Sequence, residues 1–173
     1  MIKDIFKSKE KYVTNAPESE CAWTTANYIT KDSTGNFQRL YQMIWNKAQE
    51  IFGPLEASPD NAGRCAAYTT SNRYWGFQPH QHCCEINVVY YLRVPPVTNE
   101  LFGSLWMTED INAPSPWDYI VPHEGTLVFM DPDVWHDPFY VPSKEHRISI
   151  NIELNLTEGV DPQIYHDWNL RYI

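Results

Sequence analysis

The hydrophobic positions within residues 36–52 repeat at intervals of three and four, which is the spacing of one face of an α-helix. The apolar side chains of this face are Phe37, Leu40, Tyr41, Ile44, Trp45, Ala48, Ile51 and Phe52. Gly53 and Pro54 follow directly, and such a pair is typical of a helix end. We therefore predict a helix over 36–52 within an N-terminal segment, 1–60. The polar first part of that segment, 1–20, is predicted to be loose or to lie at an edge.

Beyond residue 60 the pattern changes to short β-prone runs that turn residues separate. The runs predict strands near 64–70, 73–78, 86–93, 102–107, 117–121, 126–130, 135–140 and 146–154. Short strands joined by tight turns favour a double-sheet jelly roll, or double-stranded β-helix, over a parallel α/β sheet. We predict one mainly β domain over 1–173 with a jelly-roll core at 64–155 and the helix supporting an outer face. The C-terminal tail, 156–173, is predicted to form a short helix or an arm.

The composition is that of a folded globular domain, because 43% of the residues are hydrophobic, 20% are charged and 14% are aromatic. The length of 173 residues suits one domain. No apolar run approaches the roughly 18 residues that cross a membrane, and the start of the chain has no apolar signal segment. The cysteines, at 21, 65, 83 and 84, are therefore expected to be reduced thiols, and the protein is expected to be cytoplasmic.

Negative charge is concentrated in the second part of the chain. The net charge is −9, and residues 51–173 carry sixteen acidic side chains against six Lys and Arg. Such a surface repels a phosphate backbone, which argues against a nucleic-acid partner. We therefore expect a small molecule or a peptide as the partner, and no membrane.

Three of the histidines are spaced as metal ligands would be. His80 and His82 are two residues apart, so in a strand both rings point to the same face. His136 follows 54 residues later, after enough strands to return across a β-barrel. Two near ligands and one distant ligand can occupy one side of a metal ion and leave positions open for O₂ and other ligands. The alternative is that these are ordinary surface or core histidines.

An arginine stands in an otherwise apolar strand shortly after His136. In the alternating register, Arg147 and Ser149 share a face with Asn151, while isoleucines occupy the opposite face. A guanidinium in such a strand requires an anionic partner, and its two parallel N–H groups fit a carboxylate. The alternative is a surface ion pair with an acidic partner, for which the candidates are Glu85, Glu145 and Glu153.

Taken in order, these motifs resemble those of the 2-oxoglutarate/Fe(II)-dependent oxygenases, and in particular a short bacterial and phage branch of that superfamily. The motifs are His80-x-His82, INVVYYLRVP, Pro122-His-Glu-Gly125, Trp135-His136 and Arg147-x-Ser149. The resemblance covers about half of the chain, near residues 75–155. It implies a double-stranded β-helix and a hydroxylase that uses Fe(II), 2-oxoglutarate as cosubstrate and O₂.

The resemblance also implies roles for individual residues. The iron ligands would be His80, His82 and His136. Arg147 and Ser149 would hold the distal carboxylate of 2-oxoglutarate, and Asn87, which aligns with small polar residues in the family pattern, would contact the cosubstrate.

One position departs from the family pattern, which has two histidines and one carboxylate. Here the second position of the first motif is His82 rather than Asp or Glu. Either all three ligands are histidines, or His82 is the first ligand and Glu85 supplies the carboxylate through a bulge at Cys83 and Cys84. We favour three histidines, with Glu85 as the alternative ligand.

The same residues leave other functions open. A cupin-type dioxygenase with three-His iron and no 2-oxoglutarate has a similar first motif, His80-x-His82-x-x-Glu85. A zinc or copper site could instead combine Cys83 and Cys84 with the two near histidines. A jelly roll can also be a binding module without catalytic activity. The sequence specifies neither the substrate nor the oligomeric state.

Overall fold

The structure is a computed structural model that describes residues 1–7, 22–24, 35–58, 63–70, 79–112, 114, 117–160 and 171–172. The elements in chain order are α1 (Ile2–Lys7), β1 (Ala22–Thr24), α2 (Gly35–Phe52), β2 (Gly63–Thr70), β3 (Ile86–Arg93), β4 (Leu105–Thr108), β5 (Asp118–Ile120), β6 (Leu127–Met130), β7 (Trp135–Pro138), β8 (Arg147–Leu154) and β9 (Arg171–Tyr172).

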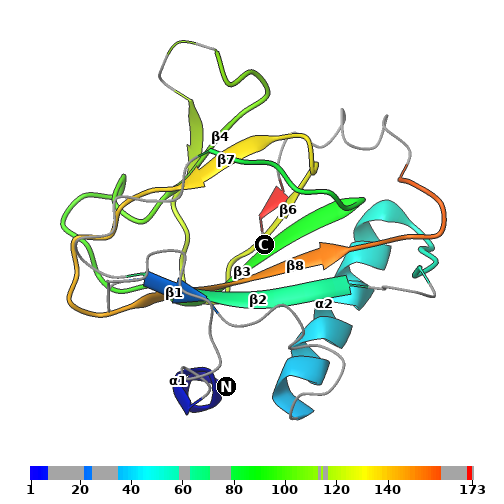
Figure 1. Ribbon diagram of the computed structural model, residues 1–173, viewed down its shortest axis with the longest axis horizontal. Helices are drawn as coiled ribbons and strands as arrows, with labels where there is room; N and C mark the ends of the chain where they lie inside the picture. Colours follow the sequence, from blue (N-terminus) through cyan, green and yellow to red (C-terminus); the bar gives the residue numbers. More distant parts are fainter. Residues whose placement is uncertain are drawn as a thin grey trace.

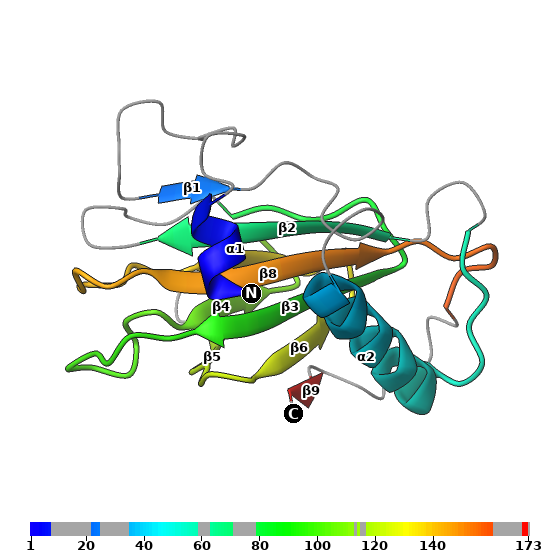
Figure 2. The ribbon, with the colours of Figure 1, turned by 90° about the horizontal axis from the view of Figure 1, so that it is seen from below.

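The strands form two antiparallel sheets that face each other. The larger sheet has the order β1-β2-β8-β3-β6-β9, and the smaller has the order β5-β4-β7. Both helices cover the outer face of the larger sheet, and the smaller sheet lies on its other side (Figures 1 and 2). This is the mainly β jelly roll with a supporting helix that the sequence predicted.

The predicted helix is confirmed, with one residue added at its start. Its buried side chains are Phe37, Leu40, Ile44, Ala48 and Phe52, which belong to the predicted apolar face. Gly53 ends the helix with a φ of 85°, a backbone conformation that glycine adopts without strain. The N–H of Gly53 donates to the carbonyl of Gln49 at 3.0 Å, which caps the last turn.

Most predicted strands are present, and the differences lie at their ends. β3 has the predicted bounds, and β2, β6 and β8 each begin within one residue of the prediction. β4 begins at Leu105 rather than at 102, because Gly103 has a φ of 76° and lies in a turn. β7 ends at Pro138 rather than at 140. The strand predicted at 73–78 lies outside the described residues.

The ends of the chain were predicted less well. The loose segment predicted at 1–20 is wrong for its beginning, where α1 is a helix and Ile5 is only 1% exposed. Ile5 packs into the same core as α2, so tertiary burial stabilises a helix that would be too short to form alone. In the C-terminal tail, β9 pairs with β6, and 161–170 lie outside the described residues.

Two hydrophobic layers lie on opposite faces of the larger sheet. The outer layer, between this sheet and the helices, includes Ile44 and the isoleucines of β8. The inner layer, between the sheets, includes Val89, Tyr91 and Leu105. Among the described helices, none is long and apolar enough to cross a membrane.

Candidate metal centre

Backbone pairing brings two histidines together that are distant in the sequence. His80 and His136 form an isolated antiparallel bridge, in which the N–H of each donates to the carbonyl of the other at 3.2 and 3.1 Å. The N–H of His82 donates to the carbonyl of Pro132 at 3.2 Å, which fixes the segment that carries both near histidines. Since side chains of directly opposed residues lie on the same face, the rings of His80 and His136 are neighbours.

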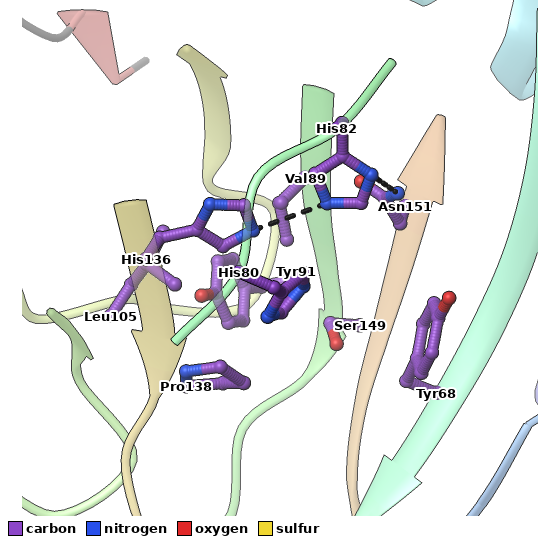
Figure 3. A pocket seen from close by; sticks show the side chains of 10 residues that line it. All are labelled: Tyr68, His80, His82, Val89, Tyr91, Leu105, His136, Pro138, Ser149 and Asn151. Atoms are coloured by element: carbon purple, nitrogen blue, oxygen red, sulfur yellow. Dashed lines mark hydrogen bonds between the residues drawn. The ribbon is translucent and has the colours of Figure 1, made fainter. Parts of the chain in front are cut away.

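The three rings converge between the sheets (Figure 3). One ligand atom from each of His80, His82 and His136 lies within 4.8 Å of the other two, and the Nε2 atoms of His82 and His136 are 3.2 Å apart. Two ligand atoms at right angles on a metal, each bonded at about 2.1 Å, lie about 3.0 Å apart. The observed separation is therefore close to that of two ligands sharing one ion.

Hydrogen bonds at the far side of two rings determine which nitrogen faces the cluster. Nδ1 of His136 lies 3.1 Å from the carbonyl oxygen of Val134, and Nδ1 of His82 lies 2.8 Å from Oε1 of Glu153. A carbonyl and a carboxylate only accept, so each Nδ1 carries a hydrogen. In neutral rings both Nε2 lone pairs then face each other at 3.2 Å, an arrangement that a shared cation stabilises.

The environment keeps His136 neutral. Burial, followed by the proximity of His80, lowers the pKa of His136 from 6.5 to about 3. Only 4% of the residue is exposed. A neutral imidazole is the form that binds a metal, so this ring is available as a ligand well below pH 7.

Glu85 does not join the three histidines. Its Oε2 accepts the backbone N–H of Leu156 at 2.9 Å, and its own N–H donates to the carbonyl of Leu154 at 3.1 Å. Among the described residues, the cluster suited to a metal contains the three histidines and no carboxylate. This geometry favours the three-His arrangement over the one with Glu85.

The cysteines next to His82 also lie outside this cluster. Cys83 is exposed, while burial and then the charge of Glu153 raise the pKa of Cys84 to about 12. In the metal-free protein Cys84 is therefore a protonated thiol. The described geometry gives no support to a site that combines both cysteines with the near histidines.

A cavity of about 320 Å³ adjoins the histidines. Apart from them it is lined by Tyr68, Val89, Tyr91, Leu105, Pro138, Ser149 and Asn151. The volume is at the small end for ligand pockets. Ser149 was predicted to belong to the site, whereas Tyr68 was not, because the pairing of Tyr68 with Ser149 across β2 and β8 is a tertiary contact. Asn151 could have been found from its alternation with Arg147 and Ser149.

Arg147 lies on the same face of β8 as Ser149, but it is not among the residues that line the cavity. The residue is 2% exposed, and its Nη1 donates to the carbonyls of Gly103 and Phe139, each at 3.1 Å. These carbonyls flank β4 and β7, so the guanidinium links the two sheets. The alternative of a surface ion pair is wrong for this position, because the side chain is buried.

Asn87 is fully buried on β3, in alternation with the cavity residues Val89 and Tyr91. It does not itself line the cavity. Within the described part of the chain, neither its Oδ1 nor its Nδ2 has a hydrogen-bond partner. A buried amide without a partner is unfavourable, so this position is a candidate for contact with a bound molecule or water.

Solved structures share this fold. A prolyl-4-hydroxylase from Pseudomonas putida aligns with 78% of this chain and 68% of its own, at 18% identity and a TM-score of 0.54. A prolyl hydroxylase from Trichoplax adhaerens, solved with a peptide fragment of the hypoxia-inducible factor oxygen degradation domain, aligns with 96% of this chain and 78% of its own, at 15% identity and a TM-score of 0.64. EvdMO1 aligns with 87% of this chain at 15% identity and a TM-score of 0.63.

These similarities concern the fold. The chain spans only 39% of the length of EvdMO1. No protein-family model and no curated protein sequence matches the chain. The neighbours therefore establish the jelly-roll fold of this chain.

Proposed function

We propose that the protein is an Fe(II)/2-oxoglutarate-dependent oxygenase, and that it acts as a hydroxylase. The observation that carries this proposal is the convergence of His80, His82 and His136 inside a jelly roll. Ser149 lines the cavity beside the histidines, and Arg147 lies two residues away on the same face of β8, so this face carries a hydroxyl and a cation of the kind that suits a carboxylate.

Each residue has a proposed task. The three imidazoles hold Fe(II), and Arg147 and Ser149 hold the distal carboxylate of 2-oxoglutarate. Together with O₂, the bound iron and cosubstrate supply the oxidising power for C–H hydroxylation, with release of succinate and CO₂. Asn87 is proposed to contact the cosubstrate.

The charge of the ligand set also favours an anionic cosubstrate. Three neutral imidazoles leave the full charge of a divalent ion in place, whereas a carboxylate ligand would reduce it by one. The apolar side chains of Val89, Leu105 and Pro138 line the same cavity and limit the access of water to the ion.

We propose a small molecule or a peptide residue as the substrate and the cytoplasm as the location. The acidic surface that residues 51–173 provide argues against nucleic acid. The Trichoplax adhaerens hydroxylase was solved in complex with a peptide, which makes peptides a reasonable first class of substrate to screen.

The test combines metal binding with product formation. The protein is titrated with Fe(II) without O₂, 2-oxoglutarate is added, and a new visible absorption band is expected only when both are present. On admission of O₂, succinate should form. His136→Ala should lose both signals, while the exposed His123→Ala should keep them. If His136→Ala kept both the absorption band and succinate formation, the proposed site would be wrong.

A three-His cupin-type dioxygenase is the second candidate, because the observed ligand set contains no carboxylate. This candidate predicts that Fe(II) binds and that 2-oxoglutarate produces neither the absorption band nor succinate. Metal binding without any O₂ consumption over a substrate panel would instead favour a binding module.

A further inference from the structure

One carboxylate contacts the histidine cluster without being a ligand candidate. Oε1 of Glu153 lies 2.8 Å from Nδ1 of His82, on the side of the ring opposite the metal-facing nitrogen. We propose that Glu153 is a positioning residue of the metal centre, which holds the His82 ring in its ligating orientation and supplies the negative charge that the three-His set lacks. This inference rests on the metal-binding part of the proposed function.

The contact is sheltered from water. The side chains of His82 and Glu153 are 10% and 20% exposed. A hydrogen bond between a ring N–H and a carboxylate is charge-assisted, and it is stronger where water is largely excluded. Nδ1 must donate in this bond, so Nε2 keeps its lone pair and points toward His136, 3.2 Å away.

The strand register explains why Glu153 can do this. Glu153 is on the site-facing side of β8, in alternation with Ser149 and Asn151. In the pairing of β8 with β3, Glu153 lies opposite Asn87, near the start of β3 and close to the segment that carries His82. Asn151 is the next residue on the same face of β8, and its Nδ2 lies 3.5 Å from Nδ1 of His82. The His82 ring therefore lies over this face of β8.

The position of the charge has a chemical consequence. A carboxylate that accepts from a ligating imidazole makes that imidazole a better electron donor and fixes its tautomer. In a two-His, one-carboxylate site the negative charge is on a ligand. Here the charge is one ring away, which leaves every ligand neutral while lowering the electrostatic cost of the ion.

Two substitutions separate orientation from charge. Glu153→Gln keeps an oxygen that can accept from Nδ1 but removes the charge, and Glu153→Ala removes both. Glu85→Gln is the matched control, because it removes one nearby carboxylate charge and retains an acceptor for the N–H of Leu156. Both Glu153 and Glu85 act on Cys84, whose pKa their charges raise, so they lie in the same region.

The measurement is the affinity for Co(II), whose visible absorption also reports ligand geometry. We expect Glu153→Gln to bind Co(II) about 10-fold more weakly and Glu153→Ala about 100-fold more weakly than the wild type. The spectrum of Glu153→Ala should also change, which a purely structural role would not cause. Glu85→Gln should stay within about threefold of the wild type.

The outcomes distinguish this inference from the proposed function. If the wild type binds Co(II) and Glu153→Ala binds it equally well, the proposed role of Glu153 is wrong, and the proposed function is unaffected. An equal loss of Co(II) affinity in Glu85→Gln and Glu153→Gln would also overturn the role of Glu153, because any nearby negative charge would then stabilise the ion equally well. Wild-type protein that binds no Co(II) would overturn both proposals. Thermal melts accompany each variant, and Glu153→Gln decides the matter if Glu153→Ala does not fold.

Discussion

The two faces of β8 differ completely in character, although they belong to one strand. The face toward the helices consists of Ile148, Ile150, Ile152 and Leu154, none of which is more than 1% exposed. The face toward the smaller sheet consists of Arg147, Ser149, Asn151 and Glu153. Successive side chains of a strand point in opposite directions, so one stretch of eight residues contributes to two environments.

The difference shows how the fold separates stability from chemistry. Full burial of an isoleucine contributes roughly 1.5–3 kcal/mol, and the helix-facing side of β8 is aliphatic throughout. The other side keeps polar groups in the interior, including an Oδ1 of Asn151 that lacks a hydrogen-bond partner among the described residues. A buried polar group without a partner lowers stability, and such groups are expected where a ligand binds.

Replacement of Ile150 by alanine tests the stabilising face. Ile150 is 0% exposed within the outer hydrophobic layer, so the cavity left behind should lower the free energy of unfolding by about 2–5 kcal/mol. Urea denaturation measures this change. The neighbouring Ser149→Ala, on the opposite face, should change the value by less than about 1 kcal/mol. Equal losses in the two variants would remove the proposed division between the faces.

Arg147→Met tests the polar face at its most buried residue. The substitution removes the donor to the carbonyls of Gly103 and Phe139, so stability should fall by about 1.5–3 kcal/mol. The affinity for 2-oxoglutarate should fall at least about 10-fold, as judged by the Fe(II)-dependent absorption band. The control is Arg93→Met, which breaks the partly exposed ion pair with Glu145 and should cost less than about 1 kcal/mol. Unchanged 2-oxoglutarate affinity would leave Arg147 with a structural role alone.

The stability of the metal-free protein should depend on pH through His136. Its pKa is about 3 in the folded state and near 6.5 when unfolded, so between these values the unfolded state binds more protons. Stability should therefore fall as the pH drops from about 6.5 toward 3, by at most about 1.4 kcal/mol per pH unit from this group. Asp137 acts oppositely between about 4 and 6, because burial raises its folded pKa to about 6.

His136→Gln isolates this contribution. In that variant the loss of stability on acidification should be smaller, while the contribution of Asp137 remains. Unfolding free energies measured at several pH values in both proteins provide the comparison. Parallel pH profiles would show that His136 is not the group responsible.

Asn87→Leu should have the smallest effect of the series on stability. The amide has no hydrogen-bond partner among the described residues and is 0% exposed, so an apolar side chain of similar size should leave stability unchanged or raise it by less than about 1 kcal/mol. A weaker binding of 2-oxoglutarate at unchanged stability would support the proposed contact with the cosubstrate. A marked destabilisation would instead mean that the amide is needed for packing.

Local periodicity was sufficient to predict the larger elements. Apolar steps of three and four specified the helix, and the alternation from Arg147 to Leu154 specified both faces of β8. The short helix α1 and the short strands β1 and β9 were not predicted. They depend on packing against or pairing with distant residues, and their own sequences are too short to carry a clear period.

The sequence predicted individual residues of the candidate site but not how they come together. The spacing of His80 and His82 predicted a shared direction, His136 was recognised as a third, distant ligand, and alternation placed Arg147 and Ser149 on one face. The resemblance to a known family then implied the role of each residue. The sequence left two ligand sets open, one with three histidines and one in which Glu85 takes the place of His80, because Glu85 is only three residues from His82. The structure directs Glu85 to the backbone of Leu156 and brings Glu153 to His82 instead, across a separation of 71 residues.

The sequence by itself therefore determined which side chains share a face, since side-chain direction follows from the local backbone repeat. Only the tertiary structure decided which faces meet. The bridge between His80 and His136 joins the segment before β3 to β7, and the contact of Glu153 with His82 depends on the pairing of β8 with β3. Such pairing is set by the packing of the whole core, because a shift of one residue would turn an entire strand over.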